Sequence, residues 1–242
     1  MGVRARPFTF GVVPSPYQVF MHLEEAAMKS PLRYQATDAD CGKTSFVNAF
    51  MYLFERSEIP PQAVDFVTRV TGDCNLAVNG YYRGTSAHAL AFMAAWCNDY
   101  LVKAGMPVRC QALRDDEVSM AEGSPLVEGL RSGAVAVCGC HLSVDHYVLM
   151  TGIDDESVYL FDPFYEPWPP EHFDVPPEGV VWVDDQPFSY NRIVSRAVLD
   201  DPESISYTLH AVSGRDAVLM WRTDDALATW HPSQRLHEES RA

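Results

Sequence analysis

The sequence lacks any segment that would carry the chain into a membrane. No apolar run among its 242 residues approaches the roughly 20 residues that a spanning helix needs. The opening residues, MGVRARPFTFGVV, are basic but contain no continuous apolar core and no small-residue cleavage site, so we expect no signal peptide. We therefore expect a cytoplasmic protein without a membrane partner.

Positive charge is also scarce. The chain has 18 Lys and Arg against 33 Asp and Glu, a formal net charge of −15. This excess argues against nucleic acid and against anionic membrane surfaces as partners. Internal repeats and low-complexity segments are absent, and the 47% hydrophobic content is typical of a globular protein.

Disulfide scaffolding is excluded on similar grounds. The six cysteines are even in number, but the chain is long enough for a sizeable core and shows no export signal. We expect reduced thiols, at positions 41, 74, 97, 110, 138 and 140.

The elements that are present divide the chain into a helical first half and a strand-rich second half. The patterns predict a short strand over 8–13 and helices over 16–28, 42–57, 60–72 and 85–105. They predict strands over 107–112, 134–142, 146–153, 157–163, 180–184, 205–212 and 216–222. This order indicates an α+β fold. We expect one domain over 1–230, with an N-terminal arm over 1–33 and a flexible tail over 231–242.

One cysteine stands where an extended segment turns into a helix. After Gly42 the apolar residues recur at steps of three and four, as on one face of a helix: Phe46, Val47, Phe50, Met51 and Phe54. Asp38, Asp40 and Thr44 are residues that cap helix starts, so Cys41 is expected at the N-terminal end.

Cys41 can be interpreted as a buried structural thiol of the core. Its position at a helix start also allows a chemical role. The unpaired N–H groups and the dipole of a helix start favour a thiolate, which is the nucleophilic form of cysteine. Gln35 lies six residues upstream, and its side-chain amide can donate to an oxyanion that forms beside the sulfur.

A predicted hairpin supplies partners for this thiol. Its strands, 146–153 and 157–163, flank the turn signal Asp154–Asp155. If they pair symmetrically about Asp154, His146 lies opposite Asp162. The apolar pairs on the same face, Val148 with Leu160 and Met150 with Val158, would then pack against the helices. A carboxylate beside an imidazole orients a general base.

Together these residues resemble the papain-like cysteine peptidases, and in particular the C39-like peptidase family. The motifs that carry the likeness are Gln35, Asp40–Cys41–Gly42, HYVLMTG (146–152) and LFDP (160–163), with YLFERSEIPP (52–61) and PFSYNR (187–192). The likeness spans about 34–222. Lys43 departs from the family, in which a small apolar residue or proline commonly follows the Cys-Gly pair.

The resemblance implies a papain-like fold, with a helical layer packed on an antiparallel β-sheet. It implies Cys41 as nucleophile, His146 as base, Asp162 as the residue that orients the base, and Gln35 as oxyanion donor. No transporter segment accompanies these motifs, so we expect a stand-alone peptidase and not the processing role of the transporter-linked members.

Other patterns offer rival interpretations. Cys138, Cys140, His141 and His146 include good zinc ligands, but the two cysteines alternate within an apolar strand, so we expect no metal site. His141 is an alternative catalytic base, although no carboxylate matches it in the hairpin. The acidic pairs at 115–116, 154–155, 184–185, 200–201 and 224–225 are interpreted as solvated turns.

The functional prediction is a cysteine peptidase-like hydrolase that acts on a peptide or related amide and requires no cofactor. An acyl or amide transferase would use the same Cys41, His146 and Asp162, because an amine can intercept an acyl-enzyme in place of water. A non-catalytic peptide-binding module is the third alternative.

Overall fold

The structure is a computed structural model that describes residues 30–72, 84–142, 144–165, 178–203 and 206–224. The predicted strand 8–13, the predicted helix 16–28 and the predicted tail lie outside these ranges. Leu32 is buried in the main apolar cluster, so this part of the predicted arm already belongs to the body of the protein.

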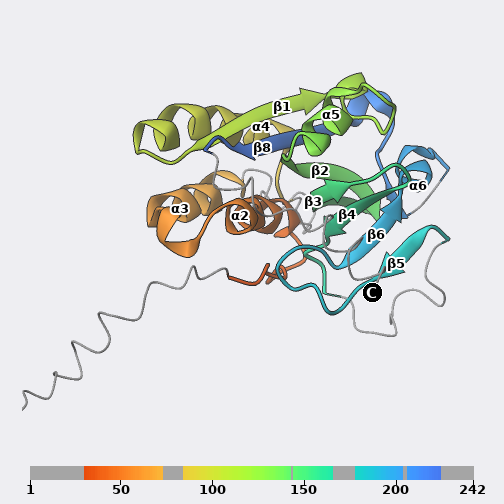
Figure 1. Ribbon diagram of the computed structural model, residues 1–242, viewed down its shortest axis with the longest axis horizontal. Coiled ribbons are helices and arrows are strands. Elements are labelled where there is room, and N and C mark those ends of the chain that lie inside the picture. The colour runs from red at the N-terminus through yellow and green to blue at the C-terminus, as the bar shows by residue number, and fades with distance from the viewer. Residues whose placement is uncertain (1–29, 73–83, 143, 166–177, 204–205, 225–242) are drawn as a thin grey trace, which may run out of the picture.

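An antiparallel β-sheet of eight strands organises the described residues (Figure 1). Its strands follow the order β1-β8-β2-β3-β4-β6-β5, and β7 pairs with β2. The bounds are β1 Val108–Arg114, β2 Val135–Leu142, β3 Asp145–Ile153, β4 Ser157–Phe161, β5 Val180–Trp182, β6 Arg192–Ser195, β7 Ser206–Thr208 and β8 Asp216–Arg222. Because helices from the first half pack on this sheet, the predicted α+β class is confirmed.

Helices cover both faces of the sheet. The first face carries α2 (Cys41–Leu53), α3 (Pro61–Val70) and α4 (Ala87–Trp96), which continues as a π-helical turn over Cys97–Leu101. The second face carries α5 (Pro125–Arg131) and α6 (Arg196–Asp200). Short 3-10 turns lie at Arg56–Glu58, Asp115–Glu117 and Val212–Gly214. None of the helices in the described ranges has the length and apolarity to cross a membrane.

The central helix α2 is buried on almost every side, and not only along the predicted stripe. Every residue of α2 except Lys43 is buried. Helices that are buried all round are core helices, and here the sheet and α3 pack against α2. The helix ends at Leu53, earlier than the predicted residue 57, because Phe54 is extended and a 3-10 turn follows.

The hairpin of β3 and β4 forms, but its predicted register is wrong. Met150 pairs with Leu160, and Ile153 pairs with Val158. Asp154 closes the turn by accepting the N–H groups of Glu156 and Ser157, so the hairpin is centred after Asp154 and not on it. Near the turn the register is displaced by three residues from the predicted one, and a bulge between Met150 and Gly152 takes back one of them.

The net displacement at Met150 is two residues, which leaves the same side chains on the same face. That face lies on the other side of the sheet from α2, however. Val148, Met150, Val158 and Leu160 pack with α5 and α6, while Leu149 and Phe161 pack with α2. The predicted burial of the apolar pairs against the first helices is therefore wrong.

The sequence patterns also missed β6 and α6. β6 pairs on both sides, with β4 and with β5, so it is an inner strand of the sheet. Its four residues are too few to show a period.

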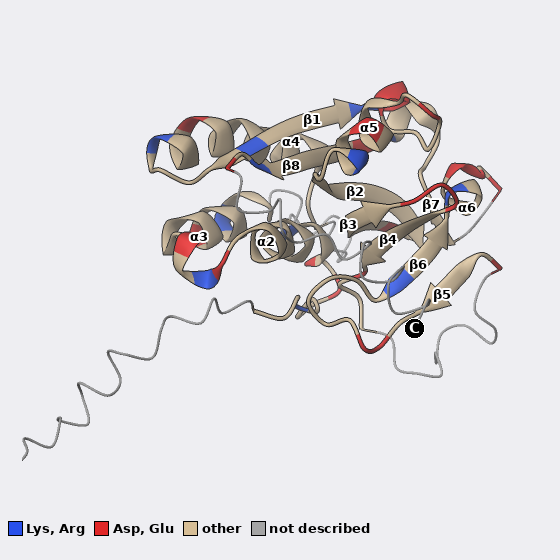
Figure 2. Ribbon diagram, viewed as in Figure 1, with Lys and Arg blue, Asp and Glu red and all other residues tan. Residues whose placement is uncertain are grey.

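Acidic residues lie mainly at turns and on helices around the sheet, as Figure 2 shows. Asp115, Asp116, Asp154 and Asp155 are exposed. These positions agree with the interpretation of the pairs 115–116 and 154–155 as solvated turns. Asp200 departs from it, because it lies half-buried in α6 and its carboxylate accepts from the Met120 N–H and from Arg215.

Gly42 provides a test of how closely α2 approaches its neighbours. A Cβ at Gly42 would lie 2.7 Å from Thr85 Cβ and 3.1 Å from Tyr147 Cδ2. We expect Gly42→Ala to destabilise the protein by about 1–3 kcal/mol through overpacking, which outweighs the helix propensity gained, about 1 kcal/mol. Urea denaturation measures the difference. Gly214→Ala is the matched control, because nothing lies within 4 Å of its added Cβ. Equal stability of the two variants would contradict the close contact.

Candidate active site

Cys41 is the first residue of α2, as predicted, and it is 7% exposed. Asp40 occupies the N-cap position, but its side chain does not cap the helix. Its carboxylate instead accepts from Lys43 Nζ at 2.8 Å, which corrects the predicted capping role. The N–H groups at the helix start are therefore not occupied by this carboxylate and lie beside the thiol.

The structure brings three of the predicted residues together. Nε2 of His146 lies 2.7 Å from Oδ1 of Asp162, and the two side chains are 6% and 1% exposed. The Cys41 side chain lies close enough to His146 to contribute to the electrostatics of its ring. Since Nε2 bonds to Asp162, Nδ1 is the ring nitrogen left for the sulfur.

Electrostatics keep the imidazole charged in this setting. Burial lowers the pKa of His146, but the charge and hydrogen bond of Asp162, followed by those of Cys41, raise that pKa to about 10. Burial also opposes ionisation of Asp162, yet the charge and hydrogen bond of His146 lower the pKa of this carboxyl. At neutral pH the pair is therefore an imidazolium and a carboxylate.

Several residues that the sequence patterns did not single out hold Asp162 in place. Its Oδ2 accepts from the Tyr207 hydroxyl at 2.7 Å, and its Oδ1 accepts from the Phe164 N–H at 2.8 Å. Asn191 binds the backbone of Asp162 twice, accepting its N–H at 2.7 Å and donating to its carbonyl at 2.8 Å. Arg192 Nε donates to the Tyr207 oxygen at 3.2 Å.

Tyr207 is the most constrained of these residues. Its backbone has φ 63°, in the left-handed region that bulky residues rarely adopt. Burial, then the charge of Asp162, raises the pKa of Tyr207, so the hydroxyl stays a donor. The resemblance pointed to the 187–192 segment, which contains Asn191 and Arg192, but no sequence signal marked Tyr207.

Gln35 lies on a segment that runs beside Asp162. Its backbone N–H donates to Pro163 O at 2.8 Å, and the neighbouring Tyr34 packs on Phe161 with ring centroids 5.3 Å apart. The Gln35 amide donates to Thr37 O at 3.1 Å, which uses one of its two N–H groups. Within the described residues no hydrogen bond joins Gln35 to Cys41, so the oxyanion role stays a prediction.

The four residues considered as alternative zinc ligands do not form one site in the described part of the chain. These residues are Cys138, Cys140, His141 and His146. Cys138 and Cys140 are fully buried in β2, where burial raises the pKa of both thiols. His146 is held by Asp162, while His141 lies near Asp145 and His210. The five described cysteines are all free thiols.

No family model matches the sequence, and no curated protein matches it significantly. Among solved structures, the chain is similar to a candidate C39-like peptidase from Bacillus anthracis, with 15% identity and a TM-score of 0.47 over 80% of this chain and 96% of that chain. It is also similar to a double-glycine motif protease of an AMS/PCAT transporter, with 18% identity and a TM-score of 0.31 over 58% of this chain and 79% of that chain. Both identities are low, and the contacts of the site itself carry its chemical interpretation.

The charge state of His146 can be tested directly. We expect its ring to stay protonated until the pH approaches about 10. In Asp162→Asn the ring should lose its proton at a much lower pH, because the anionic partner is gone. Histidine NMR titration, with the resonance assigned from His146→Gln, measures both values.

The same shift links this pair to stability. The folded-state pKa lies above the unfolded value of about 6.5. The stabilisation is therefore complete below that value and is lost as the pH rises toward about 10. A wild-type ring that titrates near its ordinary pKa would refute the charged pair.

Proposed function

We propose that the protein is a cysteine peptidase-like hydrolase, with Cys41 as nucleophile, that cleaves a peptide or related amide bond. The observation that carries this proposal is the buried, hydrogen-bonded pair of His146 and Asp162 with the Cys41 side chain beside it. A nucleophile, a base and a residue that orients the base are the parts that covalent catalysis needs.

The first half of the reaction forms an acyl-enzyme. The imidazolium of His146 stabilises the Cys41 thiolate, which attacks the substrate carbonyl carbon. The oxyanion forms beside the start of α2, where backbone N–H groups and the remaining N–H of the Gln35 amide can donate to it. His146 then gives its proton to the leaving nitrogen, the C–N bond breaks, and an acyl thioester remains on Cys41.

The second half of the reaction reverses the role of His146. The ring, now neutral, takes a proton from water as the water oxygen attacks the thioester carbon. The C–S bond breaks, the acid product leaves, and the thiolate and imidazolium are restored. Asp162 stays ionised throughout, and it fixes the ring so that Nδ1 faces the sulfur.

Selective alkylation tests the nucleophile without knowledge of the substrate. Near pH 6 an ordinary thiol, with a pKa of about 8.5, is well under 1% ionised. A small haloacetamide at that pH should modify Cys41 first, because among the five described cysteines this is the sulfur that lies beside an imidazolium. Burial raises the pKa of Cys138 and Cys140, which makes them slow. Peptide mapping after brief labelling compares all six cysteines in one sample.

His146→Ala should abolish this preference, since it removes the imidazolium and leaves the thiol in place. Uniform labelling of the wild-type protein, or faster labelling of Cys110, would refute the activated thiol and favour a binding module.

Acyl-enzyme formation tests the covalent step. An activated ester such as p-nitrophenyl acetate should give a burst close to one equivalent of nitrophenol, and mass spectrometry should find the acyl group on Cys41. Cys41→Ala should lose the burst, and His146→Ala should come close to losing it. Gln35→Ala should slow acylation by about 10²-fold, the scale for loss of one oxyanion donor.

Thr37→Ala is the matched control for Gln35→Ala, because Gln35 bonds to the Thr37 backbone oxygen, which that variant keeps. A normal acylation rate in Gln35→Ala would refute its oxyanion role. If an added amine captures the acyl group much faster than water does, the transferase alternative replaces hydrolysis.

A further inference from the structure

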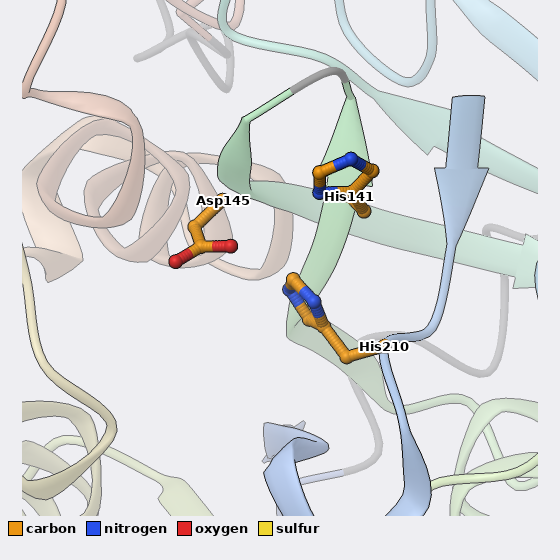
Figure 3. A group of neighbouring side chains, drawn as sticks. All are labelled: His141, Asp145 and His210. Atoms are coloured by element: carbon orange, nitrogen blue, oxygen red, sulfur yellow. The ribbon is translucent and has the colours of Figure 1, made fainter. Parts of the chain in front are cut away.

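A second group of polar side chains lies outside the Cys41 site. His141, Asp145 and His210 each offer one ligand atom, and these atoms all lie within 4.8 Å of one another. Figure 3 shows the two imidazoles and the carboxylate directed toward a common space. The mechanism above uses none of the three.

Two of these residues are held by the sheet itself. His141 of β2 and Asp145 of β3 are direct cross-strand partners at the end of the hairpin. Side chains of such partners share one face and have Cβ atoms about 5 Å apart, so the backbone places these groups side by side. Ligands on strands keep their geometry better than ligands on loops.

The third residue reaches the same point from another part of the chain. β7 pairs with β2 at His141, and His210 follows two residues after the end of β7. His210 has φ 24°, a left-handed value that is unfavourable for a residue with a side chain. Arg215 Nε donates to the His210 carbonyl at 2.9 Å and helps to hold this conformation. Strained residues cluster at functional sites, because the surrounding structure must enforce them.

We propose that His141, Asp145 and His210 bind one divalent transition-metal ion, with Zn²⁺ as the leading candidate. Two imidazoles and a carboxylate form a donor set that Zn²⁺ uses, with water completing four-coordination. Donor atoms around a tetrahedral zinc lie about 3.4 Å apart, which follows from bond lengths of about 2.0–2.1 Å. The ligand atoms therefore need to move closer to one another by about 1 Å, and small rotations of these partly exposed side chains can supply that movement.

The surroundings favour a cation here. Asp216 lies within electrostatic range of His210, and it accepts a hydrogen bond from Tyr147 at 3.0 Å. The chain as a whole is strongly acidic.

The ion would connect two parts of the active-site scaffold. Asp145 is exposed and His146 is buried, in agreement with the alternation of side chains along β3. The metal ligands are thus separate from the His146 contacts. His210 lies three residues after Tyr207, which holds Asp162. Binding would fasten the exit of β7 to the β2–β3 hairpin and stabilise the folded chain.

Zinc titration of the full chain tests this site. Cys41→Ala is used as the background, because a thiolate beside an imidazole binds zinc on its own. After treatment with a chelator, calorimetry should find one Zn²⁺ per chain, and zinc should raise the melting temperature. Co²⁺ should give ligand-field absorption without a thiolate charge-transfer band.

Removing either imidazole should weaken zinc binding by at least ~10- to 100-fold, which is the loss caused by removing a residue that hydrogen-bonds to a metal ligand. His141→Ala and His210→Ala remove the imidazoles, and Asp145→Asn removes the carboxylate. His88→Ala is the matched control, since His88 is exposed on α4 and should leave both readouts unchanged. Circular dichroism without metal checks that each variant is folded. Absence of zinc binding in the background protein, or equal binding in His141→Ala and His210→Ala, would overturn the proposal.

Discussion

The buried carboxylate of Asp162 imposes the strictest requirement on the described structure. An isolated charge in a protein interior is costly, so it must find partners that offset the loss of water. His146 of β3, Asn191 before β6 and Tyr207 of β7 all bind Asp162 or its backbone. These partners come from separate strands, so the sheet must assemble before the charge is satisfied. The same network that keeps Asp162 ionised keeps His146 protonated and oriented.

The helical layer that contains α2 must place the Cys41 thiol beside His146. Ser45 donates to the Tyr147 carbonyl, which fastens α2 to β3 close to both Cys41 and His146. Gly42 allows the helix to approach Thr85 and Tyr147. Close packing is therefore enough to explain a glycine at position 42, apart from any part that it has in catalysis. Because α2 is buried on nearly every side, the position of Cys41 is set by the core, and a rigid core is what holds a nucleophile in line with its base.

Much of this arrangement could be predicted from local patterns, and the exceptions have physical causes. The turn residues and the β-rich runs predicted β2, β3 and β4, and the helical period predicted α2. The predicted hairpin register was wrong because the side chain of Asp154 closes a turn displaced from the expected centre, and a bulge after Met150 removes only one residue of that displacement. His146 and Asp162 still met, because the net displacement of two residues preserves the face and a diagonal pair remains within reach. Tyr207 and β6 could not be predicted, since their roles come from contacts between distant segments. Asp40 illustrates a local competition in which an ion pair with Lys43 replaced the helix cap.

Two residues with a left-handed backbone conformation lie at and just after β7, and one of them is a ligand of the proposed metal site. Tyr207 and His210 both have positive φ, although neither is a glycine, and only two residues separate them. A single strained residue can be explained by its own contact, as Tyr207 is by its bond to Asp162. For His210 the described contacts are the bond from Arg215 Nε to its carbonyl and a T-shaped approach of its ring to His141, with ring centroids 6.0 Å apart. A ligand shared with His141 and Asp145 would supply an interaction for that side chain. The proposed ion would therefore offset part of the strain at His210 through the imidazole itself.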